Sequence, residues 1–246
     1  MSQPALEAYY DFDGVFNAFP ERDILKRGGQ NHMEWMKPGD ERAELYDPDN
    51  NAFLLNGNKV LKVREGRYRI HWSNELSFRT RLLCGQTGMG FNWLTTWQPY
   101  TALLDNLLGF YDDGNVGAGR PISTKTEQWY DPDTREGIWT GKCDTITSRI
   151  RKSASDGSSL RLIWIDDEEC DYINVKKVKD ALDGNPDADI KVLMVRPDER
   201  IGISRRQFDR ITEFAREPDG FDRLTVDTEP SIKDPVGMMR LNHLGF

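Results

Sequence analysis

Two aspartates follow a short apolar run close to the start of this 246-residue chain. The run, residues 8–10, has the sequence AYY and predicts a buried strand, and Asp11 and Asp13 come after it. Gly14 then predicts a break into a loop. Residues i and i+2 of an extended segment share one face, so both carboxylates are expected to point into one crevice at the carboxyl end of the strand. Open α/β sheets bind their ligands in this crevice.

Two carboxylates held this close repel each other unless a cation or a proton lies between them. Mg²⁺ is the expected cation because it is a hard divalent ion that prefers oxygen ligands. A carboxylate beside Mg²⁺ can also attack phosphorus as a nucleophile. The same Asp and Gly residues are ordinary turn chemistry, so this stretch alone also fits a simple loop. The rest of the chain must decide between these two interpretations.

The composition is that of a globular protein without a global basic field for nucleic acid. Hydrophobic residues make up 37% and charged residues 30%, which is polar but not typical of disorder. The net charge of −8 leaves room only for a local basic groove. Free or buried thiols in a reducing compartment are expected, because the three cysteines lie far apart without a CxxC pair: Cys84, Cys143 and Cys170.

The N-terminal sequence lacks the basic segment and the long apolar core of a signal peptide. No apolar run approaches the length of a membrane span. The expectation is therefore a soluble, cytoplasmic protein that has no membrane partner. The sequence leaves the oligomeric state open.

Apolar runs alternate with amphipathic segments along most of the chain, which predicts an α/β fold with a mostly parallel sheet. Ser73 is the predicted N-cap of one helix, which ends within residues 85–90, and Ser204 is the predicted N-cap of another. Strands are predicted at residues 8–10, 52–55, 60–63, 67–72, 91–95, 120–123, 160–165 and 189–195, and further helices at 100–108, 142–152, 175–182 and 205–216.

Two stretches interrupt this alternation. Residues 19–66 are rich in Pro, Gly, Asn and Asp and are interpreted as an inserted flap or cap after the first strand, because so long a structureless loop would be unusual. Residues 109–141 form a second, loop-rich insertion. The core domain would then cover residues 1–220. A C-terminal extension, residues 221–246, would pack through Met238, Met239, Leu241 and Leu244.

Further polar residues occupy comparable places in the predicted fold. Thr95 ends one strand, Lys142 opens the helix before a later strand, and Asp166 and Asp167 end that later strand. The strand ends of a parallel sheet lie along one edge, so these groups can converge with the first aspartates. The set suits phosphoryl transfer, which needs positioning and neutralisation of charge. Mg²⁺ and Lys142 would offset phosphoryl charge, and the Thr95 hydroxyl would donate a hydrogen bond.

Each of these assignments has an alternative. Thr96 competes with Thr95, and Lys125 and Lys152 are substitutes for Lys142. The two aspartates at 166 and 167 could instead cap the following helix. Four tryptophans lie near presumed loops and could stack on a nucleic-acid base, although core packing is the commoner role: Trp72, Trp97, Trp129 and Trp139.

These motifs resemble those of the haloacid dehalogenase-like (HAD) phosphohydrolase superfamily. The four matching elements are DFDGVF at residues 11–16, NWLTTW at 92–97, Lys142, and LIWIDDE at 162–168. The finer resemblance is to actinobacterial and phage HAD domains associated with RNA-repair proteins, which carry W-x-T-x-W and W-I-D-D-E and a similar strand and helix at 192–214. The resemblance covers roughly residues 5–216 and is weak in the two insertions.

The resemblance implies a Rossmannoid three-layer core and a Mg²⁺-dependent phosphohydrolase that cleaves a phosphate monoester. Asp11 would be the nucleophile and form an aspartyl-phosphate. Asp13 would act as general acid on the leaving oxygen and then as base on water, which requires that it holds a proton while Asp11 stays ionised. Its backbone carbonyl would also bind Mg²⁺.

The remaining roles follow the same resemblance. Thr95 and Lys142 would bind the phosphoryl group. Asp166, with Asp167 directly or through water, would complete the metal site, and which of the two touches the metal stays open. The expected substrate is a phosphorylated small molecule, in particular a nucleotide, or a nucleic-acid phosphate end, selected by the two insertions. The alternative is a catalytically inactive HAD-fold binding or assembly module, of phage origin, that contacts a partner protein.

Overall fold

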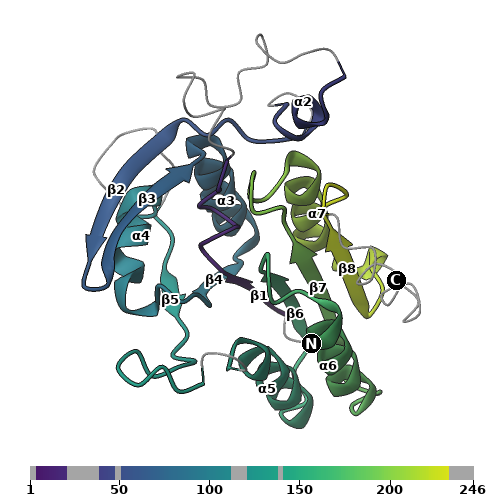
Figure 1. Ribbon diagram of the computed structural model, residues 1–246. Helices are drawn as coiled ribbons and strands as arrows, with labels where there is room; N and C mark the ends of the chain where they lie inside the picture. The colour runs from purple at the N-terminus through teal and green to yellow at the C-terminus, as the bar shows by residue number, and fades with distance from the viewer. Residues whose placement is uncertain (1–3, 21–38, 48–50, 112–120, 138–140, 233–246) are drawn as a thin grey trace.

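The computed structural model describes residues 4–20, 39–47, 51–111, 121–137 and 141–232. Within this part, the core is a six-stranded sheet with the strand order β5-β4-β1-β6-β7-β8 (Figure 1). Every neighbouring pair is parallel. The strands are β1 (Ala5–Tyr10), β4 (Gly90–Trp93), β5 (Thr124–Thr126), β6 (Leu160–Ile165), β7 (Ile190–Arg196) and β8 (Leu224–Thr228).

The strand order reverses beside β1. The chain runs from β1 outward through β4 to β5, and then returns to the other side of β1 to form β6. The carboxyl ends of β1 and β6 therefore lie next to each other at the switch point, where open α/β sheets bind ligands. The predicted α/β class with a parallel, Rossmann-like sheet is confirmed.

Helices cover both faces of the sheet, which makes three layers (Figure 1). Alternate residues of β6 face the two cores: Ile163 and Ile165 lie in one, and Leu162 and Trp164 lie in the other. All six positions of β6 are buried, which explains its nearly continuous apolar sequence. The first core is shared with α3 (Asn74–Thr87), α4 (Thr101–Leu108) and α7 (Arg205–Arg216), and the second with α5 (Gly141–Ser155) and α6 (Tyr172–Asp183).

A separate two-stranded antiparallel sheet lies between β1 and α3 in the chain. It consists of β2 (Gly57–Val63) and β3 (Gly66–Trp72), it lies at one side of the molecule in Figure 1, and Leu61, Ile70 and Trp72 contribute to the first core. Asn17, after β1, ties this hairpin to the core because its Oδ1 accepts a hydrogen bond from the His71 backbone N–H at 2.9 Å. The hairpin therefore has a fixed connection to the segment that carries the first two aspartates.

The two predicted N-caps agree with the structure. The Ser73 hydroxyl accepts from the backbone N–H of Leu76 at 3.3 Å, and α3 ends with Gly88 in the left-handed region. Ser204 and Gln207 form a reciprocal capping box at the start of α7. The structure also contains the short helix α2 (Glu41–Leu45) and the 3₁₀ turns η1 (Gln98–Tyr100) and η2 (Pro218–Gly220).

Two predicted strands are wrong. Residues 52–55 form irregular backbone, and their apolar character comes from side-chain packing against α7. Phe53 lies 6.0 Å from the Phe208 ring, and the Arg205 guanidinium lies 4.5 Å from the Phe53 ring. The third strand of the parallel sheet is Thr124–Thr126, whereas residues 120–123 were predicted, and residue 120 lies outside the described part.

The parallel sheet continues past residue 220. Strand β8 pairs with β7 at the sheet edge, so residues 224–228, which were assigned to the C-terminal extension, form part of the parallel sheet. The predicted packing of Met238, Met239, Leu241 and Leu244 lies outside the described residues, as does Trp139. Among the described helices, none is long and apolar enough to cross a membrane.

Candidate functional site

Three aspartates from two neighbouring strands converge at the carboxyl edge of the sheet. Asp11 follows β1, and Asp166 and Asp167 follow β6. The Asp11 backbone N–H donates to the Ile165 carbonyl at 3.0 Å, which continues the β1–β6 pairing up to the acidic residues. One carboxylate oxygen of each aspartate lies within 4.8 Å of the others. The predicted convergence of Asp11 with Asp166 and Asp167 is confirmed.

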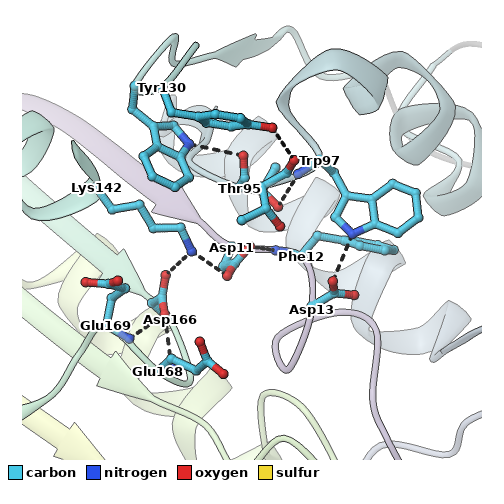
Figure 2. Close-up of polar contacts among 12 residues, drawn as sticks. Asp11, Phe12, Asp13, Thr95, Trp97, Tyr130, Lys142, Asp166, Glu168 and Glu169 are labelled. Carbon is cyan, nitrogen blue, oxygen red and sulfur yellow. Dashed lines mark hydrogen bonds and ion pairs between the residues drawn. The ribbon is translucent and has the colours of Figure 1, made fainter. Parts of the chain in front are cut away.

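Lys142, in the first turn of α5, bridges two of these carboxylates (Figure 2). Its Nζ lies 2.6 Å from Asp11 Oδ2 and 2.7 Å from Asp166 Oδ2, and its side chain is 6% exposed. Burial alone would lower the pKa of Lys142, but the two carboxylates raise it well above its usual value, so the lysine stays charged. The substitutes lie elsewhere, Lys125 on the edge strand β5 and Lys152 in the last turn of α5.

Burial disfavours the ionised forms of Asp166 and Asp167. Asp166 is fully buried, and its Oδ1 accepts from the backbone N–H groups of Glu168 at 3.1 Å and Glu169 at 2.7 Å. Burial raises the pKa of Asp166 despite the nearby lysine. Burial, together with the charges of Asp166 and Asp11, raises the pKa of Asp167 to about 8.

The donor set fits a hard divalent cation. The three carboxylates carry three negative charges and Lys142 carries one positive charge, so the fully ionised cluster has an excess of two negative charges. Carboxylate oxygens are the ligands that Mg²⁺ prefers, at about 2.0–2.1 Å, so opposite ligands are roughly 4.2 Å apart. At most one pair of the three ligands can be opposite, and neighbouring ligands lie roughly 2.9 Å apart, so the three oxygens, which lie within 4.8 Å of one another, would draw closer around the ion. Asp11, Asp166 and Asp167 could therefore hold Mg²⁺.

Asp13 lies on the other side of Asp11 from the lysine and is held through both of its oxygens (Figure 2). Asn17 Nδ2 donates to Oδ1 at 2.7 Å, and the Trp97 indole Nε1 donates to Oδ2 at 2.9 Å. Burial raises the pKa of Asp13, although these two hydrogen bonds oppose the shift. A carboxyl group that is fixed in place and keeps a proton more readily than usual is suited to general acid chemistry.

Thr95 lies beyond the end of β4 rather than within it, because the strand stops at Trp93. The Leu94 N–H still donates to the Tyr10 carbonyl at 2.8 Å. Thr95 therefore comes directly after the last hydrogen bond between the β4 and β1 segments, at the carboxyl edge of the sheet. Its buried hydroxyl accepts from the Trp97 backbone N–H at 3.2 Å. The alternative, Thr96, is exposed, and its carbonyl accepts from the Tyr130 hydroxyl at 2.7 Å.

The tryptophans proposed for base stacking separate into two groups. Trp72 is a core residue of the hairpin, and Trp129 is buried against Lys142, with its ring centre 5.6 Å from the lysine Nζ. Trp97 is largely buried but forms part of the wall of a cavity beside Asp13. Among the described tryptophans of this set, Trp97 is therefore the one that lines this cavity and could contact a ligand there.

The sequence analysis missed three residues that position the acidic groups. Asn17 and the Trp97 indole hold Asp13, and Gly14 makes room for Asp167. Trp97 had a signal, since it lies two residues after Thr95 in the W-x-T-x-W motif. The role of Asn17 had none, because it depends on the place of the hairpin.

Replacement of Gly14 by alanine should disturb the cluster directly. Gly14 has φ +67°, and a Cβ built on it would lie 2.1 Å from Asp167 Cγ. Gly109 also has φ +67°, with nothing within 4 Å of its Cβ position, so Gly109→Ala is a matched control for the left-handed backbone. We expect Gly14→Ala to reduce the free energy of unfolding by about 2 kcal/mol more than Gly109→Ala, because overpacking adds to the backbone strain.

Urea denaturation of both glycine variants with and without Mg²⁺ measures this difference. Stabilisation by Mg²⁺ should persist in Gly109→Ala and be lost in Gly14→Ala, whose Asp167 carboxylate must move. Equal losses in the two variants would show that the contact between Gly14 and Asp167 has no effect on the cluster.

Comparisons with protein-family models, with curated proteins and with solved structures found no match to this chain.

Proposed function

We propose that this protein is a Mg²⁺-dependent phosphohydrolase that cleaves a phosphate monoester through an aspartyl-phosphate. The observation that carries the proposal is the convergence of Asp11, Asp166 and Asp167 at the switch point of the sheet, with Lys142 bridging the first two. Asp13 lies two residues after Asp11 and is held by a hydrogen bond from the Trp97 indole. It would add a proton donor to this set. The HAD-like motifs of the sequence support the same assignment.

In the first half of the proposed reaction, a carboxylate oxygen of Asp11 attacks phosphorus, and the bond from phosphorus to the leaving oxygen breaks. Asp13 gives its proton to that oxygen, which leaves as an alcohol. Lys142 already contacts Asp11 Oδ2 at 2.6 Å and would place its charge beside the phosphoryl oxygens. Thr95 would donate its hydroxyl hydrogen to the same group.

In the second half, water attacks the phosphorus of the aspartyl-phosphate, and the ionised Asp13 takes the proton of the water. Phosphate leaves and the Asp11 carboxylate is restored. When bound by Asp11, Asp166 and Asp167, Mg²⁺ would neutralise negative charge on the phosphoryl oxygens. The β2–β3 hairpin, between β1 and β4 in the chain, would be the flap of this active site.

A phosphatase assay with p-nitrophenyl phosphate tests the proposal. We expect turnover with Mg²⁺ and none after chelation with EDTA. A sample that is folded by circular dichroism but turns over neither this ester nor nucleotides nor phosphorylated nucleic-acid ends would contradict the proposal. That result would favour the alternative, a binding or assembly module on the same fold.

The affinity for Mg²⁺ should rise with pH. Because the pKa of Asp167 is raised to about 8, this carboxyl group is protonated below pH 8 and must lose its proton before it binds a cation. The apparent Kd for Mg²⁺ should therefore fall about tenfold per pH unit between pH 6 and 8 and level off above that range. Isothermal titration calorimetry in buffers of different ionisation enthalpy measures both the affinity and the released proton.

Asp167→Asn should abolish most of this pH dependence, whereas Glu168→Gln, at the exposed neighbouring position, should retain it. A Kd that is independent of pH in the unaltered protein would show that Asp167 does not exchange a proton for the cation.

A further inference from the structure

We propose that the cavity beside Asp13 binds the leaving group of the substrate, and that this group is a nucleoside whose base stacks on the cavity's aromatic wall. This inference rests on the proposed function and specifies its substrate. The cavity measures about 220 Å³. Its lining includes Asp13, Glu65, Tyr68, Trp97, Tyr100 and Tyr130.

The position of the cavity identifies which half of the substrate it would receive. Asp13 lines it, whereas Asp11, Asp166 and Asp167 are not among its described lining residues. The side chain that would protonate the leaving oxygen therefore faces the cavity, and the groups that would hold the phosphoryl group lie outside it. A substrate whose phosphorus lies at Asp11 would extend its alcohol portion past Asp13 into this space.

Aromatic rings from separate parts of the chain surround the space. Tyr68 comes from β3 of the hairpin, Trp97 and Tyr100 from the segment after β4, and Tyr130 from the loop before α5. The ring centres of Tyr68 and Trp97 are 5.3 Å apart, and their planes form an angle of 73°. The ring centres of Trp97 and Tyr100 are 6.4 Å apart, with an angle of 75° between the planes. Tyr68 is 42% exposed, so ring surface remains available for a planar ligand.

The polar groups at the cavity suit a base better than a plain aryl ring. Glu65 supplies a carboxylate, which accepts from the Tyr100 hydroxyl at 2.8 Å, and Arg135 supplies guanidinium donors. The edges of nucleobases carry both donors and acceptors and can use both kinds of group. The volume is below the range of about 300–1,000 Å³ for drug-sized ligands, so one nucleoside fits better than several nucleotides.

The test compares adenosine and guanosine 5′-monophosphates with ribose 5-phosphate, which has the same sugar and phosphate but no base. We expect kcat/KM to be about tenfold or more higher for the better nucleotide, because stacking on one aromatic side chain has an effect of this size. Tyr68→Ala should reduce this preference at least about fivefold, and Tyr68→Phe should restore it because the ring is kept. Phe78→Ala removes an aromatic side chain that is 43% exposed on α3 and should leave the preference intact.

Binding of adenosine and guanosine, measured by saturation-transfer NMR, separates this inference from the proposed function because nucleosides carry no phosphate. Nucleoside binding that Tyr68→Ala weakens, without turnover of any ester, would support the cavity and contradict the phosphatase. Turnover with equal kcat/KM for nucleotides and ribose 5-phosphate would support the phosphatase and overturn the inference. Equal kcat/KM values for phenyl phosphate and for nucleotides would also overturn the inference.

A free nucleotide and the unpaired end of a nucleic-acid strand both carry a base, a sugar and a terminal phosphate. A 5′-phosphorylated oligonucleotide, single-stranded or paired in a duplex, distinguishes these sources. Hydrolysis of the single strand with the same sensitivity to Tyr68→Ala would identify a strand end, and hydrolysis of mononucleotides alone would identify the free nucleotide.

Discussion

Asp11→Asn should reduce phosphatase turnover about a thousandfold or more while the protein stays folded. An amide oxygen is a poor nucleophile toward phosphorus, so the variant cannot form the aspartyl-phosphate of the proposed reaction. The fold should tolerate the change because an amide oxygen can still accept the hydrogen bond that the Phe12 backbone N–H donates to Asp11 Oδ1 at 2.6 Å. The substitution also removes one of the three neighbouring negative charges of Asp11, Asp166 and Asp167. Initial rates with p-nitrophenyl phosphate at saturating Mg²⁺ measure the loss.

Asp144→Asn is the matched control, because Asp144 is an exposed aspartate in the first turn of α5, away from the cluster. Its activity should stay within about twofold of the unaltered protein. Appreciable turnover by a folded Asp11→Asn protein would show that Asp11 is not the nucleophile. A trap of the covalent intermediate by rapid quench with a ³²P-labelled substrate gives an independent measurement on the unaltered protein.

Lys142→Met should give the largest loss of stability among single substitutions in the cluster. Methionine keeps an unbranched apolar side chain but removes the charge, so Asp11 and Asp166 are left without their buried partner, close to the third carboxylate, Asp167. Breaking a buried ion pair on one side typically costs about 3–5 kcal/mol. We expect a loss of that size in urea denaturation at pH 8 with EDTA. The loss should shrink with Mg²⁺ or at pH 5, where the raised pKa of Asp167 and Asp166 lets both bind protons.

The sign of the pH effect follows from these raised pKa values. A carboxyl group whose folded-state pKa lies above its unfolded value favours the folded state when protonated, and this contribution is lost as the pH rises through the folded pKa. Lys152→Met, in the exposed last turn of the same helix, should change stability by no more than about 0.5 kcal/mol. If Lys142→Met and Lys152→Met proteins had equal free energies of unfolding at pH 8, Lys142 would not stabilise the buried carboxylates.

The parts of the fold that depend on local pattern could be predicted from the sequence. Strand β6 is a nearly continuous apolar run with helices before and after it in the chain, and Ser73 and Ser204 are capping residues at the start of α3 and α7. Failures occurred where tertiary contacts decide. Residues 52–55 are apolar because Phe53 packs on α7, and β5 is a Thr-Lys-Thr segment that becomes a strand only because β4 offers a free edge.

The acidic cluster and its lysine could be predicted because strand ends of a parallel sheet share one edge, so the topology brings Asp11, Asp166 and Lys142 together. The hydrogen bonds that hold Asp13 could not be predicted, although the W-x-T-x-W motif marks Trp97 as a residue of interest. They depend on how the chain returns after β1, and on the turn after β4 that aims the Trp97 indole at the carboxylate. Spacing in the sequence does not contain that information.

The carboxamide of Asn17 links two parts of the molecule that would otherwise be independent. Its nitrogen donates to the Asp13 carboxylate at 2.7 Å, and its oxygen accepts from the His71 backbone N–H of the β2–β3 hairpin at 2.9 Å. Any insertion, deletion or repacking that shifts β3 will therefore also reorient the carboxyl group of Asp13. Exchange of this hairpin for a different one would have to preserve the backbone position of His71, or the carboxyl group of Asp13 would lose its present orientation.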